Sequence, residues 1–160
     1  MSDIDYLIEA ARYAVEHSDD RNTQCGAVLV AQDGRKYRGA NWLPLGVVHE
    51  GSRLAGTEKY RWIEHAERAA IYRAAAMGCR ISGATLYAPW FACADCARAM
   101  IGSGVARVVG MLSLRQGTPA RWEDEIRAAE KMLSEAGVGM QWLPGRLGVT
   151  IRFDGKEIDL

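Results

Sequence analysis

The chain has 160 residues, and its 20 basic side chains balance its 20 acidic ones, so that the formal net charge is zero. Hydrophobic residues make up 49% of the sequence and charged residues 25%, which excludes a disordered or fibrous protein and fits a globular domain. No apolar run approaches the roughly 18 residues of a membrane-spanning helix, and the lack of a basic excess argues against a protein that binds long nucleic acid through its phosphates.

The first half of the chain predicts a helix, two strands and a long loop. Apolar residues at helical spacing predict an amphipathic helix from about Ile4 to His17, with Asp3 as its N-cap. Because this N-terminal segment is acidic and helical, it does not look like a signal peptide, and we expect a cytoplasmic protein. The apolar run from Gly26 to Ala31 predicts a strand covered on both faces, followed after a turn by a strand from about Lys36 to Ala40. The loop from Asn41 to Lys59 is long enough to favour a functional role.

The second half of the chain alternates helices with strands. The expected elements are a helix from about Glu64 to Met77, a strand from Ala84 to Ala88, a helix from about Ala94 to Ser103, a strand from Val105 to Gly110, a helix with Trp122, Ile126, Ala129 and Leu133 on one face, a strand from Val138 to Leu143, and a hairpin at residues 149–160. This alternation predicts a single α/β domain over residues 1–160, with a five-stranded mixed sheet flanked by helices in three layers.

Two of the four cysteines are placed for metal or redox chemistry. Cys93 and Cys96 form a C-x-x-C pair at the start of a predicted helix, where both sulfurs share one helical face and the helix N-terminus favours the thiolate form. His65, at the start of the preceding helix, offers an imidazole. One imidazole and two thiolates suit zinc and leave a fourth tetrahedral position for water, as in a catalytic zinc site.

Glu67 stands two residues after His65, too close for both side chains to be ligands of the usual helical kind. We expect its carboxylate to lean over the metal-bound water. Two thiolates and a neutral imidazole roughly cancel the charge of zinc, so this water should be less acidic than in a three-histidine site, where its pKa is about 7. A carboxylate within hydrogen-bond reach compensates, because it can accept the water proton and pass it to a ring nitrogen and a departing amine.

Five segments between about Asn22 and Val138 form one set of motifs: NTQCGAV, GANWLPLG, HAERAAI, the stretch from Leu86 to Val105 that contains PWFACADC, and AEKMLSEAGV. H-x-E followed by P-C-x-x-C is the signature of zinc nucleobase deaminases, and this chain has all of it except the proline. The set resembles the cytidine and deoxycytidylate deaminase superfamily, and within it most closely the dCMP deaminases. The resemblance implies a cytidine-deaminase-like fold, one zinc ion per chain on His65, Cys93 and Cys96, Glu67 as the proton shuttle, and a homo-oligomer.

The resemblance also implies a small-molecule substrate, a cytosine nucleotide, with dCMP preferred. Water would replace the amino group of the base and give uracil and ammonia. Asn41 would contact the sugar, the backbone of Ala66 would hydrogen-bond the pyrimidine, and the carbonyl near Phe91 would accept from the exocyclic amine.

Three positions depart from the family motifs. Ala92 replaces a proline that stiffens the loop before the first zinc cysteine and binds no metal, so catalysis can survive its loss. Trp42 replaces a glycine in a loop that contributes to the regulatory site of dCMP deaminases controlled by dCTP. Ala69 replaces an asparagine two residues after the glutamate. These changes bear on the substrate and on regulation more than on the reaction class.

Two alternatives stay open for the function. The substrate can be another small amine, such as a nucleoside, a modified pyrimidine or a free base such as guanine. A C-x-x-C pair also occurs in zinc-binding or redox modules that are not enzymes.

Several other side chains have both a functional and a structural interpretation. His49 is a candidate for a second metal site, although no cysteine or histidine lies near it in sequence. Cys25, just before a buried strand, is expected to be a small hydrophobic residue of the core. Phe91 and Trp90 can stack on the base or belong to the core. Three arginines are candidates to bind a phosphate: Arg21, Arg115 and Arg121.

Overall fold

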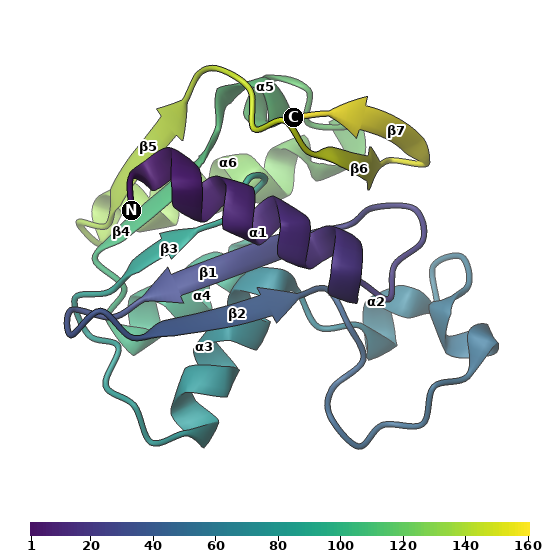
Figure 1. Cartoon of the computed structure of the whole chain (residues 1–160), viewed down its shortest axis with the longest axis horizontal. Helices are drawn as coiled ribbons and strands as arrows, with labels where there is room; N and C mark the ends of the chain where they lie inside the picture. The colour runs from purple at the N-terminus through teal and green to yellow at the C-terminus, as the bar shows by residue number, and fades with distance from the viewer.

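The computed structural model describes all 160 residues and contains the predicted five-stranded mixed sheet (Figure 1). The strands are β1 Gly26–Val30, β2 Lys36–Ala40, β3 Thr85–Tyr87, β4 Arg107–Met111 and β5 Gly139–Leu143. They follow the spatial order β2-β1-β3-β4-β5. β1 is antiparallel to both of its neighbours, whereas β3, β4 and β5 run parallel to one another.

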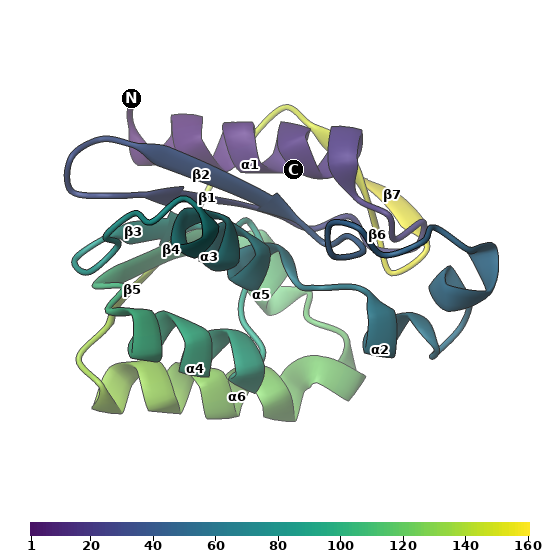
Figure 2. The same ribbon diagram turned by 90° about the horizontal axis from the view of Figure 1, so that it is seen from below.

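The helices cover both faces of this sheet. They are α1 Asp3–His17, the 3₁₀ helix η1 Gly51–Leu54, α2 Lys59–Trp62, α3 Ala66–Ala76, α4 Ala94–Ser103, α5 Leu112–Gln116 and α6 Ala120–Glu135. Figure 2 shows α1 over one face, and α3, α4 and α6 on the other, which confirms the three-layer prediction. None of the helices combines the length and hydrophobicity that a bilayer crossing requires.

The buried parts of the central strands are apolar, and each face of these strands meets a separate hydrophobic cluster. In β1, Leu29 packs into the cluster beneath α3, α4 and α6, and its neighbour Val28 packs into the cluster beneath α1. In β4, Val108 and Val109 divide between the two clusters in the same way. This two-sided burial is the physical reason for the continuous apolar runs of the sequence.

Two helix starts differ from the prediction. Ser2, not Asp3, is the N-cap of α1: Ser2 Oγ accepts from the backbone N–H of Asp5, and the Asp5 carboxylate accepts from the backbone N–H of Ser2 at 2.8 Å. Asp3 instead accepts a hydrogen bond from the Tyr87 hydroxyl at 2.8 Å. The predicted helix from Glu64 begins at Ala66, because Glu64 pairs with the chain after β2.

The C-terminal segment forms the predicted hairpin, with strands β6 Thr150–Phe153 and β7 Lys156–Asp159. Its apolar side chains join the cluster beneath α1. Its backbone bonds to the loop before β1: the Gly155 N–H donates to the Asn22 carbonyl, and the Gln24 N–H donates to the Arg152 carbonyl, both at 2.8 Å. The hairpin therefore braces that loop.

β2 and α3 approach so closely at Gly39 that no side chain fits there. A Cβ atom on Gly39 would lie 2.2 Å from the Ala66 carbonyl oxygen and 2.5 Å from the Ala70 nitrogen.

We expect Gly39→Ala to lower the free energy of unfolding by about 1–3 kcal/mol, the usual effect of overpacking, measured by urea denaturation. Gly102→Ala is the matched control, since a Cβ there meets nothing within 4 Å and alanine favours the helix by about 0.5–1 kcal/mol. Equal effects of the two substitutions would contradict this account of the packing.

Candidate active site

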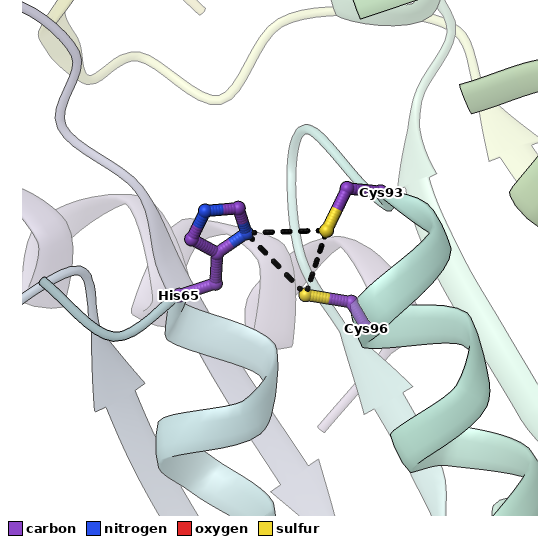
Figure 3. A group of neighbouring side chains, drawn as sticks. All are labelled: His65, Cys93 and Cys96. Carbon is purple, nitrogen blue, oxygen red and sulfur yellow. Dashed lines mark hydrogen bonds between the residues drawn. The ribbon is translucent and has the colours of Figure 1, made fainter. Parts of the chain in front are cut away.

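The first turns of α3 and α4 lie side by side and bring an imidazole and two thiols together (Figure 3). His65 is the N-cap residue of α3, Cys93 is the N-cap residue of α4, and Cys96 lies in the first turn of α4. The Nδ1 atom of His65 lies 3.4 Å from Sγ of Cys93 and 3.5 Å from Sγ of Cys96, and the two sulfurs are 3.6 Å apart.

This triangle has the dimensions of a zinc site. Tetrahedral zinc, with bonds of about 2.3 Å to sulfur and about 2.0 Å to nitrogen, separates two sulfurs by roughly 3.8 Å and a sulfur from a nitrogen by roughly 3.5 Å. The separations in the structure agree with these values to within about 0.2 Å. His65, Cys93 and Cys96 therefore form a zinc site with three protein ligands, as the sequence predicts.

The surroundings favour negative charge on the sulfurs. Neither α3 nor α4 has a side-chain cap, so the backbone N–H groups of both first turns give the site a positive potential. A hydrogen bond from Cys96, opposed by burial and helped by His65, lowers the pKa of Cys93 to about 4. The same hydrogen bond, together with burial, raises the pKa of Cys96. The two sulfurs thus share one proton, which a soft dication displaces when it binds.

A clamp of charged side chains fixes the backbone at His65. Glu64 Oε1 accepts from the His65 N–H at 2.8 Å and from Nε of Arg68 at 2.5 Å. Arg68 also pairs with Asp95 of α4 at 3.2 Å and so ties the two ligand-bearing helices together. The one sign of this clamp in the sequence is the i,i+4 spacing of Glu64 and Arg68.

Glu67 lies in the first turn of α3 and lines the same pocket as His65 and Cys93. Its side chain is buried, with 5% of the residue exposed. Burial raises the pKa of Glu67, although the nearby His65 opposes the shift. A carboxyl group with a raised pKa beside metal ligands is suited to taking up and returning a proton.

The pocket beside the metal ligands collects the buried polar groups of the whole chain. It is lined by Asp20, Thr23, Cys25, Asn41, Lys59, Tyr60, His65, Ala66, Glu67, Trp90, Phe91, Ala92, Cys93, Arg121, Trp122 and Ile126. Only four polar or charged side chains of the protein are buried, and all four line this pocket: Asp20, Asn41, Lys59 and Glu67. Since buried polar groups are costly unless they are paired or used, their concentration marks the pocket as the functional site.

The three residues predicted to contact the substrate all line the pocket. Ala66 is the first residue of α3. The Asn41 amide orders the chain before β1: Oδ1 accepts from the Cys25 N–H at 2.9 Å, and Nδ2 donates to the Thr23 carbonyl at 2.7 Å. The ring of Phe91 stacks on Trp142, with ring centroids 3.9 Å apart. The Phe91 ring therefore has a packing role. This favours the backbone carbonyl of Phe91, rather than its ring, as the group that would contact the substrate.

Trp122 and Trp90 form an aromatic wall of the pocket. The Trp122 ring meets three other rings edge to face, at centroid distances of 5.8 Å from Tyr60, 6.3 Å from His65 and 6.2 Å from Trp90. The sequence predicted Trp122, Ile126, Ala129 and Leu133 on one face of a helix. Trp122 and Ile126 line the pocket, whereas Ala129 and Leu133 belong to the core, a division that periodicity alone does not reveal.

Sequence patterns gave no sign of a buried ion pair in the pocket wall. Lys59 Nζ lies 2.6 Å from Asp20 Oδ2, and both side chains are about nine-tenths buried. The pair joins α2 to the loop before β1, two segments far apart in the chain. Cys25 packs against the core as predicted and also lines the pocket, where burial raises the pKa of its thiol.

Other candidates lie outside the pocket. Of the three arginines, only Arg121 lines it; Arg21 is exposed, and Arg115 is held by Glu123 and Glu130. His49 Nε2 pairs with Asp19 at 3.1 Å and belongs to no group of three potential metal ligands, so the structure gives no support to a second metal site.

Comparisons with known proteins agree with this site. Residues 1–112 match the family model described as the cytidine and deoxycytidylate deaminase zinc-binding region. The chain is 31% identical over 127 residues to an uncharacterized deaminase in the luxG 3' region of Aliivibrio fischeri, covering 79% of this chain and 84% of that protein. It is 28% identical over 158 residues to the deoxycytidylate deaminase of Homo sapiens, covering 94% and 85%. The apo structure of the dCMP deaminase from the cyanophage S-TIM5 has the same fold, with a TM-score of 0.68 at 20% identity over 88% of this chain and 96% of that one.

We expect Cys93→Ser to reduce bound zinc, measured by mass spectrometry of the purified protein, from about one ion per chain to less than a tenth of that, because the hydroxyl is a poor zinc ligand at neutral pH. Cys79→Ser is the control, since this cysteine is free and lies outside the pocket. Full zinc content in the Cys93 variant would rule out the assigned ligand set.

Proposed function

The chain belongs to the cytidine and deoxycytidylate deaminase zinc-binding family, and within that family we propose that it converts dCMP and water into dUMP and ammonia. One observation carries the proposal: two of the zinc ligands, His65 and Cys93, and the buried Glu67 open onto a single pocket that also has an aromatic wall and two cations. The human relative, which the chain matches over nearly its whole length, is a deoxycytidylate deaminase. The cyanophage enzyme of the same fold has been solved in complex with dCMP and dUMP.

Glu67 moves the protons in the proposed reaction. Zinc, when bound, supplies an acidified water as the nucleophile. Glu67 takes one proton from that water and gives it to N3 of the base, and then gives the second to the departing amine. The water oxygen forms a bond to C4, the bond from C4 to the exocyclic nitrogen breaks, and the products are a uracil ring and ammonia. Burial of Glu67 supports this role, because its raised pKa favours return of the proton.

Three contacts are proposed for the base and the sugar. The base lies against the edge-to-face wall of Trp122 and Trp90. The backbone at Ala66 and the carbonyl at Phe91 hydrogen-bond the ring and its amine. Asn41 keeps one amide N–H beyond those that its neighbours use, and this donor meets the sugar.

We also propose that the protein is a homo-oligomer. The loop beside the pocket exposes two large apolar side chains, Leu45 and Val48. Exposed apolar residues on one loop favour a contact between subunits. Light scattering of the purified protein measures the number of chains, and a monomer at micromolar concentration would exclude the oligomer.

Glu67→Gln should lower kcat for ammonia release by at least about 10²- to 10⁴-fold, because glutamine cannot accept a proton. Zinc content should remain near one per chain, since Glu67 is not among the ligands. Glu125→Gln, on the exposed surface of α6, is the control and should leave kcat unchanged. Activity retained in the Glu67 variant would overturn the mechanism.

Steady-state kinetics on dCMP, CMP, deoxycytidine, cytosine and guanine separate the candidate substrates. We expect kcat/KM to be highest for dCMP. A preference for an unphosphorylated compound would reject the nucleotide assignment but keep the deaminase. A protein with no tightly held zinc and a reversible Cys93–Cys96 disulfide would be a redox module instead.

A further inference from the structure

Lys59 is a buried cation whose hydrogen-bonding capacity is only partly used. The residue is 6% exposed and lines the pocket, and its ammonium donates to one acceptor, Asp20 Oδ2 at 2.6 Å. An ammonium group has three N–H donors, so two remain for the pocket. Asp20 is anchored from the other side, because its Oδ1 accepts from the backbone N–H groups of Asn22 at 2.8 Å and Thr23 at 3.3 Å. The pair therefore holds the positive end of Lys59 in a fixed place on the pocket wall.

Arg121 brings a second cation to the same pocket from the first turn of α6. It pairs with Asp154 at the tip of the C-terminal hairpin, and its side chain is 52% exposed. Such a half-exposed pair holds the guanidinium loosely, since surface ion pairs contribute only about 0–1 kcal/mol. The guanidinium is therefore free to turn toward an anion in the pocket. Tyr60, on α2 beside Lys59, also lines the pocket.

The two cations lie at the same end of the pocket. Arg121 and Lys59 both lower the pKa of Asp154, Arg121 most strongly. Each cation has one carboxylate partner, Asp20 for Lys59 and Asp154 for Arg121, and each keeps N–H donors beyond that partner. These remaining charged donors favour an anionic ligand group over a neutral hydroxyl.

We propose that Lys59 and Arg121 bind the 5'-phosphate of the nucleotide substrate and so determine the preference for nucleotides over nucleosides. The inference rests on the proposed function, since it assigns the residues that recognise the phosphorylated end of that substrate. A phosphate has enough acceptor oxygens for both free N–H groups of Lys59 and for the planar fork of Arg121. Asp20 holds Lys59 in place before the substrate arrives, and the loosely held Arg121 turns toward the phosphate when it binds.

The test compares kcat/KM for dCMP with kcat/KM for deoxycytidine. The variants are Arg121→Met, and Lys59→Met combined with Asp20→Asn, which removes both charges of the buried pair and leaves none unpaired. We expect kcat/KM for dCMP to fall about 10- to 100-fold more than kcat/KM for deoxycytidine, because each variant removes a charge-assisted hydrogen bond to phosphate. Lys59→Arg keeps the cation and should restore part of the selectivity. Arg61→Met is the matched control, since Arg61 lies on the same helix with its side chain 79% exposed.

Equal losses for the two substrates, with zinc content and melting temperature unchanged, would overturn the assignment. If the wild-type protein does not deaminate dCMP, the proposed function fails, and inorganic phosphate then decides the inference separately. Phosphate that competes with the actual substrate in the wild type, and competes at least tenfold more weakly in Arg121→Met, supports the anion site; no competition in the wild type overturns it. If the double variant does not fold, Arg121→Met carries the same comparison.

Discussion

The site depends on one constraint: two helices must begin next to each other with their first residues turned inward. His65 and Cys93 occupy the N-cap positions of α3 and α4, where other helices place a serine or an aspartate. The backbone N–H groups that a side-chain cap would satisfy instead face the metal ligands. The ligands and the helix dipoles therefore act together, and the close packing of β2 on the first turn of α3 at Gly39 positions the start of α3.

A second constraint is electrostatic, because a buried polar or charged side chain needs a compensating partner. The protein buries very few polar side chains, and it buries them in one place, where each is compensated differently. Burial raises the pKa of Glu67, and the nearby His65 stabilises its carboxylate. Asn41 is compensated by hydrogen bonds to the backbone of Cys25 and Thr23. Lys59 is compensated by its ion pair with Asp20. The pocket thus has a proton-transferring end at the metal ligands and a wall that carries two cations, Lys59 of α2 and Arg121 of α6. A molecule with a reactive ring and a charged tail fits such a division.

The sequence predicted the parts that repeat locally and missed those that depend on long-range folding. Strand β2 and helix α4 were predicted to the residue because glycines, turns and apolar runs mark their ends. The zinc ligands were predicted because their spacing and chemistry are specific. Lys59 begins the short helix α2 and Asp20 lies in the loop before β1, 39 residues away in the sequence, and no periodicity links them. Trp122 carried an apolar signal, but the signal does not distinguish a core from a pocket wall.

The linear order of these parts has a consequence for biosynthesis. The three metal ligands and the strands that support them are complete once residue 111 has left the ribosome. Trp122 and Arg121 come later, and the hairpin whose Asp154 pairs with Arg121 follows them. In the order of synthesis, the metal-binding side of the pocket therefore precedes the side that α6 contributes.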